Sequence, residues 1–206
     1  LRAGAIFTLT AGGLWVYFEA LRRRKEHLRQ AKAEPSSFGT PDLGGPFKLY
    51  NVATGKIFDS ELDLKDKIAL LYFGFTHCPD ICPDELDKLG AVVKVLESKH
   101  GVNIVPIFIS VDPERDTPAV VTEYLKDFHP TIVGLTARDE SEHSHIKSVA
   151  RLFRVYFRPA QTGNTASDYL LDHSIFFYLL RDGKFERVFG RSSSVDEMVE
   201  VIRNLK

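Results

Sequence analysis

Cysteine is scarce in this sequence: Cys78 and Cys82 are the only two among 206 residues. Two cysteines are too few to build a disulfide scaffold, so a functional site is the better explanation for them. Basic clusters are also missing from most of the chain, since residues 1–34 carry seven basic and three acidic side chains and the remainder carries 20 and 25. Nucleic-acid binding depends on clustered Lys and Arg that neutralise phosphates, and we therefore exclude that class of partner.

Long apolar runs are equally rare, and the one uncharged stretch of sixteen residues is 3–18 (AGAIFTLTAGGLWVYF). It ends in aromatic residues and is followed by the basic run 22–25, an order typical of a membrane interface. Sixteen helical residues span about 24 Å, slightly less than the bilayer core of about 30 Å, so a signal-peptide core and a buried helix remain alternatives on length alone. The flanking residues favour a single transmembrane helix, continued by a charged juxtamembrane helix that stops before Pro35.

The sequence therefore divides into an anchor with its juxtamembrane helix (1–34), a linker rich in Pro, Gly and Ser (35–46) and a main domain (47–206). In the main domain, a hairpin is expected at 47–58, and a polar loop at 158–172. Apolar runs predict further strands at 68–75, 104–111, 132–135, 174–180 and 185–189, and helical spacing predicts helices around 86–96, 117–128, 146–153 and 199–205. Strands alternating with helices predict an α/β thioredoxin-like fold with an N-terminal hairpin extension.

The two cysteines lie in GFTHCPDICPD (74–84), directly after the apolar run at 68–75. Pro83 is predicted to be the first helical residue, which places Cys78 in the preceding loop and Cys82 at the helix start. The positive end of the helix dipole favours thiolates there, the form that binds metals or attacks disulfides. Sulfurs four residues apart can hold one ion or close a strained disulfide, so the spacing leaves a metal site and a redox pair open. A buried, inert pair is the third alternative.

Of the seven histidines, His173 is the best candidate for a third ligand. It lies at the end of the polar loop and just before the apolar run IFFYLL, which should neighbour the strand leading to Cys78 in a thioredoxin-like sheet. His77 adjoins Cys78 and would point the other way along an extended chain. Asp172 either accepts a hydrogen bond from the second ring nitrogen of His173 or is simply a surface residue. Two thiolates and an imidazole suit Cu(I), and Cu(II) with small rearrangement, although zinc accepts the same ligands.

With these residues identified, the chain resembles the Sco family, membrane-anchored copper chaperones for cytochrome c oxidase. The resemblance extends from Leu43 to about Gly190, with the anchor before it. It rests on the blocks LGGPF (43–47), YFGFTHCPDICP (72–83), FISVDPERDTP (108–118), VGLT (133–136), FRVYF (153–157) and DYLLDHSIFFYL (168–179).

The resemblance implies a thioredoxin fold in which Cys78, Cys82 and His173 bind copper, received from an upstream donor and delivered to the binuclear copper site of oxidase subunit II. It further implies a thiol–disulfide activity that keeps the client's cysteines reduced. The expected location is the mitochondrial inner membrane with the domain in the intermembrane space, or a bacterial inner membrane facing the periplasm. Two alternative functions remain: a thioredoxin-like thiol–disulfide reductase, which would make the chain an enzyme, and a structural Sco-like subunit of a respiratory complex.

Overall fold

The computed structural model describes Glu19, residues 43–161 and residues 169–205; for 158–161 and 169–173 it describes the backbone alone. From Leu43 onward the chain forms one compact unit. The predicted anchor (3–18) lies outside the described residues, as do nearly all of the predicted juxtamembrane helix and most of the predicted linker. In the part of the chain that is described, none of the helices has both the length and the apolar character required to cross a bilayer.

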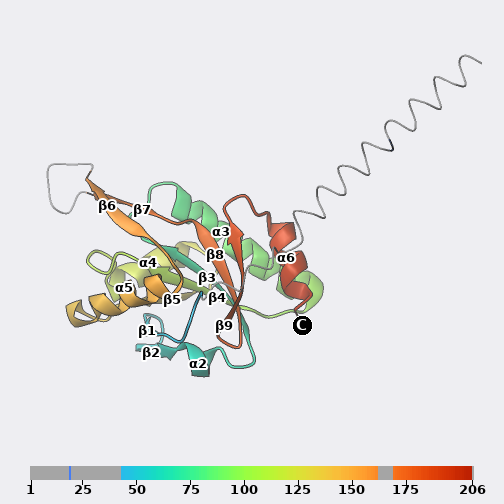
Figure 1. The fold of residues 1–206 in the computed structure, drawn as a ribbon, viewed down its shortest axis with the longest axis horizontal. Helices are drawn as coiled ribbons and strands as arrows, with labels where there is room; N and C mark the ends of the chain where they lie inside the picture. The colour runs from blue at the N-terminus through green and yellow to red at the C-terminus, as the bar shows by residue number, and fades with distance from the viewer. Residues whose placement is uncertain (1–18, 20–42, 162–168, 206) are drawn as a thin grey trace, which may run out of the picture. The chain divides into compact units, whose positions relative to one another are not determined.

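A mixed sheet of seven strands forms the centre of the described chain, in the order β2-β1-β5-β4-β3-β8-β9 (Figure 1). β3, β4 and β5 run parallel, whereas β1 and β8 run antiparallel to their neighbours in this central group. The bounds are β1 (Lys48–Asn51), β2 (Lys56–Asp59), β3 (Ile68–Gly74), β4 (Val105–Ser110), β5 (Val133–Thr136), β8 (Phe176–Arg181) and β9 (Lys184–Gly190). The predicted hairpin at 47–58 and the five other predicted strands are thereby confirmed.

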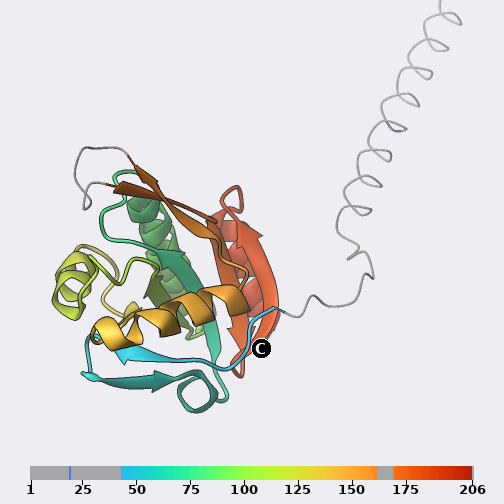
Figure 2. The ribbon, with the colours of Figure 1, turned by 60° about the vertical axis from the view of Figure 1, so that its left-hand side comes forward.

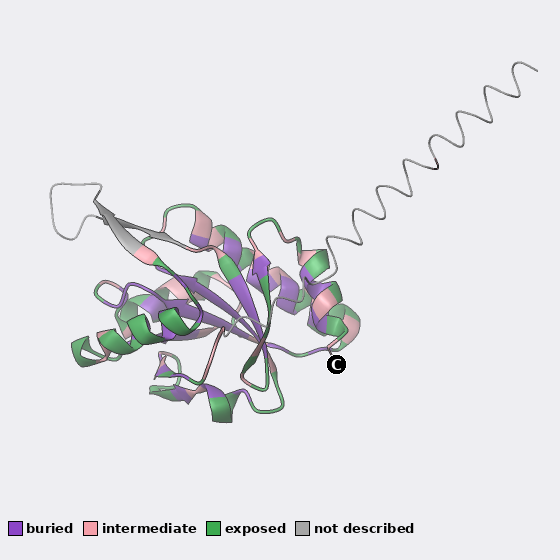
Figure 3. Ribbon diagram, viewed as in Figure 1, coloured by how far each residue is buried: buried purple, intermediate pink, exposed green. Residues whose placement is uncertain are grey.

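β3 and β4 owe their central position to continuous apolar sequence, because a parallel strand covered by helices on both faces needs apolar side chains at every position. Leu70, Leu71 and Tyr72 of β3 are fully buried, as are Ile107 and its neighbours in β4. In Figure 3 the buried class is concentrated in these inner strands and on the helix surfaces that face them. The two strands pair in register, and both end at the same edge of the sheet, where the cysteine-bearing segment begins.

Helices follow the strands as the helical spacing predicted. Their bounds are α2 (Ser60–Asp63), α3 (Ile81–Val95), α4 (Pro118–Tyr124), α5 (His143–Leu152) and α6 (Val195–Arg203), with a π-helical turn η1 (Leu96–His100) and 3₁₀ turns η2 (Leu125–Asp127) and η3 (Glu140–Glu142). The start of α4 is confirmed: Thr117 is its N-cap and accepts a hydrogen bond from the amide of Val120, and Pro118 follows in the first turn.

The helices cover both faces of the sheet. In Figure 2, α5 crosses the near face, and α3 and α6 lie behind the sheet, where they contact each other. Side chains of β3 alternate between these faces, as the pleat of a strand requires. The ring of Phe73 lies 5.4 Å from that of Phe153 at the end of α5. The hydroxyl of the preceding residue, Tyr72, reaches Cys82 in α3.

The prediction of a polar loop at 158–172 is wrong at both ends, because both ends form strands. β6 (Phe157–Gln161) and β7 (Tyr169–His173) form an antiparallel sheet of their own, in which His173 is opposite Phe157. A two-stranded ribbon pairs its backbone groups with each other and does not need the alternating apolar pattern of a strand packed on a core. This is the physical reason why its sequence was not recognised as two strands.

Candidate metal centre

The turn between β3 and α3 carries both cysteines. α3 begins at Ile81 with Asp80 in the N-cap position, so the prediction that Pro83 is the first helical residue is wrong by two residues. Proline is tolerated anywhere in the first helical turn because amides there have no acceptor within the helix, and Pro83 marked the turn without marking its first residue. Cys78 lies before the helix and Cys82 in its first turn, which agrees with the expected arrangement.

The two sulfurs are held together by the start of the helix. Both cysteines are present as thiols, Cys78 half-buried and Cys82 fully buried. The backbone amide of Cys82 donates a hydrogen bond to Sγ of Cys78 over 3.4 Å. The hydroxyl of Tyr72 approaches Sγ of Cys82 to 3.5 Å from the sheet side. Two soft donor atoms therefore meet at one helix start, with Cys78 accessible and Cys82 enclosed.

The electrostatic setting of the two thiols differs from the sequence expectation. A hydrogen bond with Cys78 and, after it, burial raise the pKa of the Cys82 thiol, and the hydrogen bond from Tyr72 opposes this only in part. Burial also raises the pKa of Tyr72. The helix dipole favours a thiolate, but at Cys82 the hydrogen bond with Cys78 and burial together outweigh it. A metal ion that binds here must therefore displace a proton from Cys82.

Gly74, the last residue of β3, makes room for this arrangement. A Cβ at this position would lie 3.0 Å from Sγ of Cys82, 2.9 Å from the ring of Tyr72 and 3.0 Å from the ring of Phe108. Such separations are shorter than normal van der Waals contact, so any side chain would push these groups apart. The glycine lets the buried sulfur lie directly against the strand.

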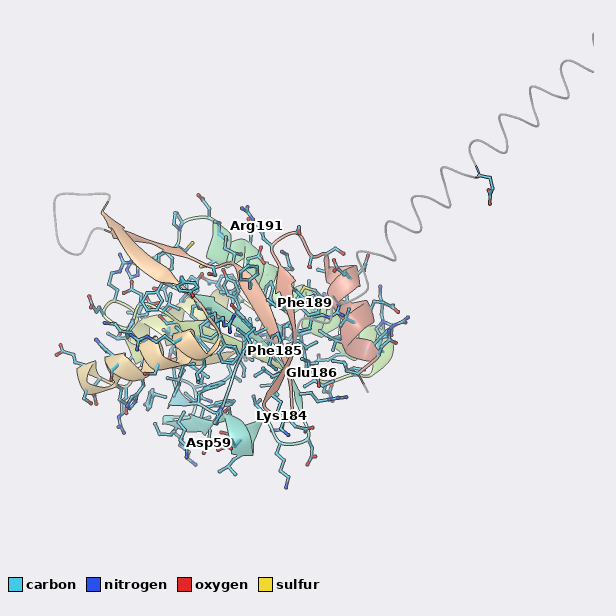
Figure 4. The ribbon with its side chains drawn as sticks, viewed as in Figure 1. Asp59, Lys184, Phe185, Glu186, Phe189 and Arg191 are labelled. Atoms are coloured by element: carbon cyan, nitrogen blue, oxygen red, sulfur yellow. The ribbon has the colours of Figure 1, made fainter. Side chains whose placement is uncertain are left out.

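The helix that carries Cys82 is fixed at its first turns by a buried ion pair. Glu85 is 3% exposed, and both of its carboxylate oxygens accept hydrogen bonds of 2.9 Å from Nζ of Lys88. The same ammonium donates to the backbone oxygen of Arg191 over 3.0 Å, which ties α3 to the segment after β9. Arg191 is labelled in Figure 4 beyond Phe189, near the end of that strand.

A second polar cluster on the other side of the turn was not found from the sequence. His77 places Nδ1 3.0 Å from the hydroxyl oxygen of Thr76 and 3.5 Å from a carboxylate oxygen of Asp116. The chain forms a turn at these residues and is not extended, in contrast to what the sequence argument had assumed. Asp116 precedes Thr117, the N-cap of α4, and so resembles an ordinary residue of a helix-start loop. Its burial is the informative property, and local sequence gave no sign of that burial.

His173 and Asp172 are placed by their backbone alone, because their side chains are not among those described. β7 ends at His173, and the next amide, from Ser174, donates to the carbonyl of Tyr156. Phe177, four residues after His173, is opposite Tyr72 in the sheet. Four extended residues span about 13 Å, so the chain brings His173 back toward the end of β3. Among the side chains that are described, no three His, Cys, Asp or Glu residues converge on a metal position, and the role of His173 stays a prediction.

Comparisons with known proteins agree with this arrangement of sheet and cysteine turn. Residues 36–206 match the model of the SCO1/SenC family. The chain belongs to that family. Protein SCO1, mitochondrial, from Saccharomyces cerevisiae is 42% identical over 208 residues, which cover 98% of this chain and 68% of the yeast protein.

Solved structures of the SCO1/SenC family share the fold. A crystal structure of Arabidopsis thaliana ScoI with copper bound superposes with a TM-score of 0.70 at 47% identity, covering 79% of this chain and 96% of that one. A more distant structure, at 25% identity and a TM-score of 0.58, is of BsSco, described as a member of the Sco family of cytochrome c oxidase assembly proteins with a disulfide switch; it covers 80% of this chain and 95% of that one. The thioredoxin-like α/β prediction is confirmed by these matches.

Proposed function

We propose that this chain is a copper metallochaperone for cytochrome c oxidase, with Cys78 and Cys82 as thiolate ligands and His173 as the third ligand. The observation that carries the proposal is that both sulfurs lie at the start of α3. The amide of Cys82 is 3.4 Å from Sγ of Cys78, and the Cys78 thiol is accessible. Thiolates are soft ligands, and soft ligands select Cu(I). A site open on the Cys78 side permits loading and release, as a carrier requires, whereas a permanent structural site is closed.

The proposed metal and the protein that receives it are inferred from the relatives of this chain. Arabidopsis ScoI holds copper, and BsSco is described as belonging to a family of oxidase assembly proteins. For this chain the proposed client is the binuclear copper site of subunit II, loaded by ligand exchange across a docked surface, after copper arrives from an upstream donor. Asp172 is proposed to orient His173, because the second nitrogen of a ligating imidazole is commonly held by a carboxylate.

The N-terminal segment is proposed to tether this domain to its membrane. Residues 1–34 would supply the transmembrane anchor and juxtamembrane helix, and residues 35–46 the linker to the copper-binding domain. Mitochondrial and Rickettsia proteins are both among the relatives. We place the domain in the intermembrane space of mitochondria, with the bacterial periplasm as the alternative.

A Cu(I) titration of the reduced full chain against a competing chelator tests the proposal. The wild type should bind one equivalent, and His173→Ala should weaken binding while the circular dichroism spectrum and thermal midpoint stay unchanged. Loss of a ligand should cost at least the roughly 10–100-fold that is typical for removal of a residue that orients a ligand. Failure of the wild type to compete for Cu(I) would refute the proposal.

Thiol–disulfide reduction is the second candidate function, because Sγ of Cys78 lies against the start of the helix that carries Cys82 and accepts a hydrogen bond from the Cys82 amide. The accessible Cys78 would attack the client's disulfide and Cys82 would resolve the mixed disulfide, so that the client is reduced and the pair is oxidised to a disulfide. Turnover assays with His173→Ala separate the two functions. Full reductase activity in a variant that no longer binds copper would establish an independent enzyme, whereas a joint loss would assign both properties to one site.

A further inference from the structure

The carboxylate of Asp116 lies behind the cysteine turn and is completely enclosed, with 0% of the residue exposed. Oδ1 accepts a 2.6 Å hydrogen bond from the hydroxyl of Thr76, and Oδ2 accepts 3.0 Å from the backbone amide of the same residue. Oδ2 also accepts 2.6 Å from the hydroxyl of Ser110 at the end of β4. Both oxygens of one buried acid are thus directed at the residue two positions before Cys78.

The backbone of Asp116 is fixed from two other directions. Its amide donates to the carbonyl of Asp112 over 2.8 Å, and its carbonyl accepts 2.9 Å from the hydroxyl of Thr136 at the end of β5. The carboxylate therefore joins the end of β4 to the cysteine turn, whereas the end of β5 is bonded only to the backbone of Asp116. Two strand ends and the turn share this single residue.

Burying a carboxylate is unfavourable unless hydrogen bonds or a cation replace its water. Among the described side chains, the imidazole of His77 lies nearest to an ion-pair position: its ring is half exposed and its Nδ1 is 3.5 Å from Oδ1 of Asp116. Hydrogen bonds from Ser110 and Thr76 carry most of the compensation, and burial still raises the pKa of Asp116 against them. Two of those bonds end on Thr76, so the enclosed acid and the cysteine turn depend on each other.

We propose that Asp116 is a positioning residue of the copper site, which acts through Thr76 to hold the segment that presents Cys78. The proposal rests on the proposed function. Asp116, the last residue of DPERD, thereby gains a role that the sequence motifs did not indicate. It keeps Sγ of Cys78 close enough to the start of α3 for both sulfurs to bind one ion.

Three variants of Thr residues around Asp116 test this assignment in the reduced full chain. Thr76→Val removes the hydroxyl that binds Oδ1 and keeps the shape, while Thr76→Ser keeps the hydroxyl. Thr136→Val is the matched control, because it removes a buried hydroxyl bonded to the same residue but on its backbone, away from the cysteine turn. Measured quantities are the Cu(I) dissociation constant by chelator competition, the alkylation rate of Cys78 in metal-free protein, and the thermal midpoint.

Thr76→Val should raise the Cu(I) dissociation constant by about 10-fold or more, the usual cost of losing a residue that orients a ligand. It should also speed the alkylation of Cys78. Thr76→Ser should retain wild-type values of both, and Thr136→Val should retain them although its thermal midpoint falls. Wild-type affinity in Thr76→Val, or equal losses in Thr76→Val and Thr136→Val, would overturn the positioning role. If the wild type itself binds no Cu(I), the proposed function fails, and the alkylation rates still decide whether Asp116 holds the turn.

Discussion

The turn with the two cysteines and the hairpin that ends at His173 are supported in different ways. The turn lies between the central strand β3 and helix α3, against side chains that are fully buried. The hairpin pairs only with itself as a separate two-stranded sheet, and its last residue is opposite Phe157. The sulfur positions are therefore set by the main core, and the backbone position of His173 is set by local pairing. Substitutions should separate the contribution of the main core from that of the local strand pairing.

The largest effect is expected from the sulfur side. Cys82→Ser replaces a buried thiol with a poor ligand for Cu(I) and should weaken Cu(I) binding by more than about 100-fold, beyond the range for removing a residue that only orients a ligand. Chelator competition measures it, and circular dichroism verifies that the variant is folded. Near-wild-type affinity in a folded Cys82→Ser variant would place copper elsewhere.

A smaller effect is expected where the sulfur packs against the sheet. Gly74→Ala forces a Cβ to within 3.0 Å of Sγ of Cys82 and should lower the free energy of unfolding. The expected loss is about 1–3 kcal/mol, the usual cost of overpacking, measured by urea denaturation. Gly190→Ala is the matched control, since the nearest atom there is 3.9 Å away and the packing stays normal. Equal stability of the two variants would mean that the contact at Gly74 relaxes without cost.

The smallest effect is expected at a surface ion pair remote from the cysteine turn. Nζ of Lys48 lies 2.7 Å from Asp59, and this hydrogen bond holds the pKa of that carboxyl below its usual value. A depressed pKa contributes stability above the unfolded-state pKa and loses it as the pH falls. Lys48→Met should therefore lower the thermal midpoint slightly at neutral pH and not in acid, where Asp59 is protonated. A larger decrease of the thermal midpoint in acid than at neutral pH would contradict this explanation.

Sequence was sufficient where burial and periodicity coincide. The apolar run at 68–75 predicted β3 because a strand covered on both faces must be apolar throughout, and Thr117 followed by Pro118 predicted the start of α4 because capping is local chemistry. The cysteine pair was identified on similar grounds, since its spacing and its place after a strand are both local. These predictions needed no knowledge of distant contacts.

Sequence was insufficient where the result depends on contacts between distant segments. Among the described strands, β6 and β7 pair only with each other, and their sequences FRPAQ and YLLDH lack the pattern of core strands. Asp116 resembles a loop residue, and its importance comes from Thr76, forty positions earlier. The raised pKa of Cys82 likewise follows from the hydrogen bond with Cys78 and then from burial, neither of which the helix-dipole argument included.

X-ray absorption spectroscopy of the Cu(I)-loaded full chain tests the central claim most directly. The account predicts a mononuclear site with two sulfur neighbours and one imidazole nitrogen, and loss of the imidazole signal alone in His173→Ala. A site with sulfur neighbours only, unchanged by His173→Ala, would contradict it.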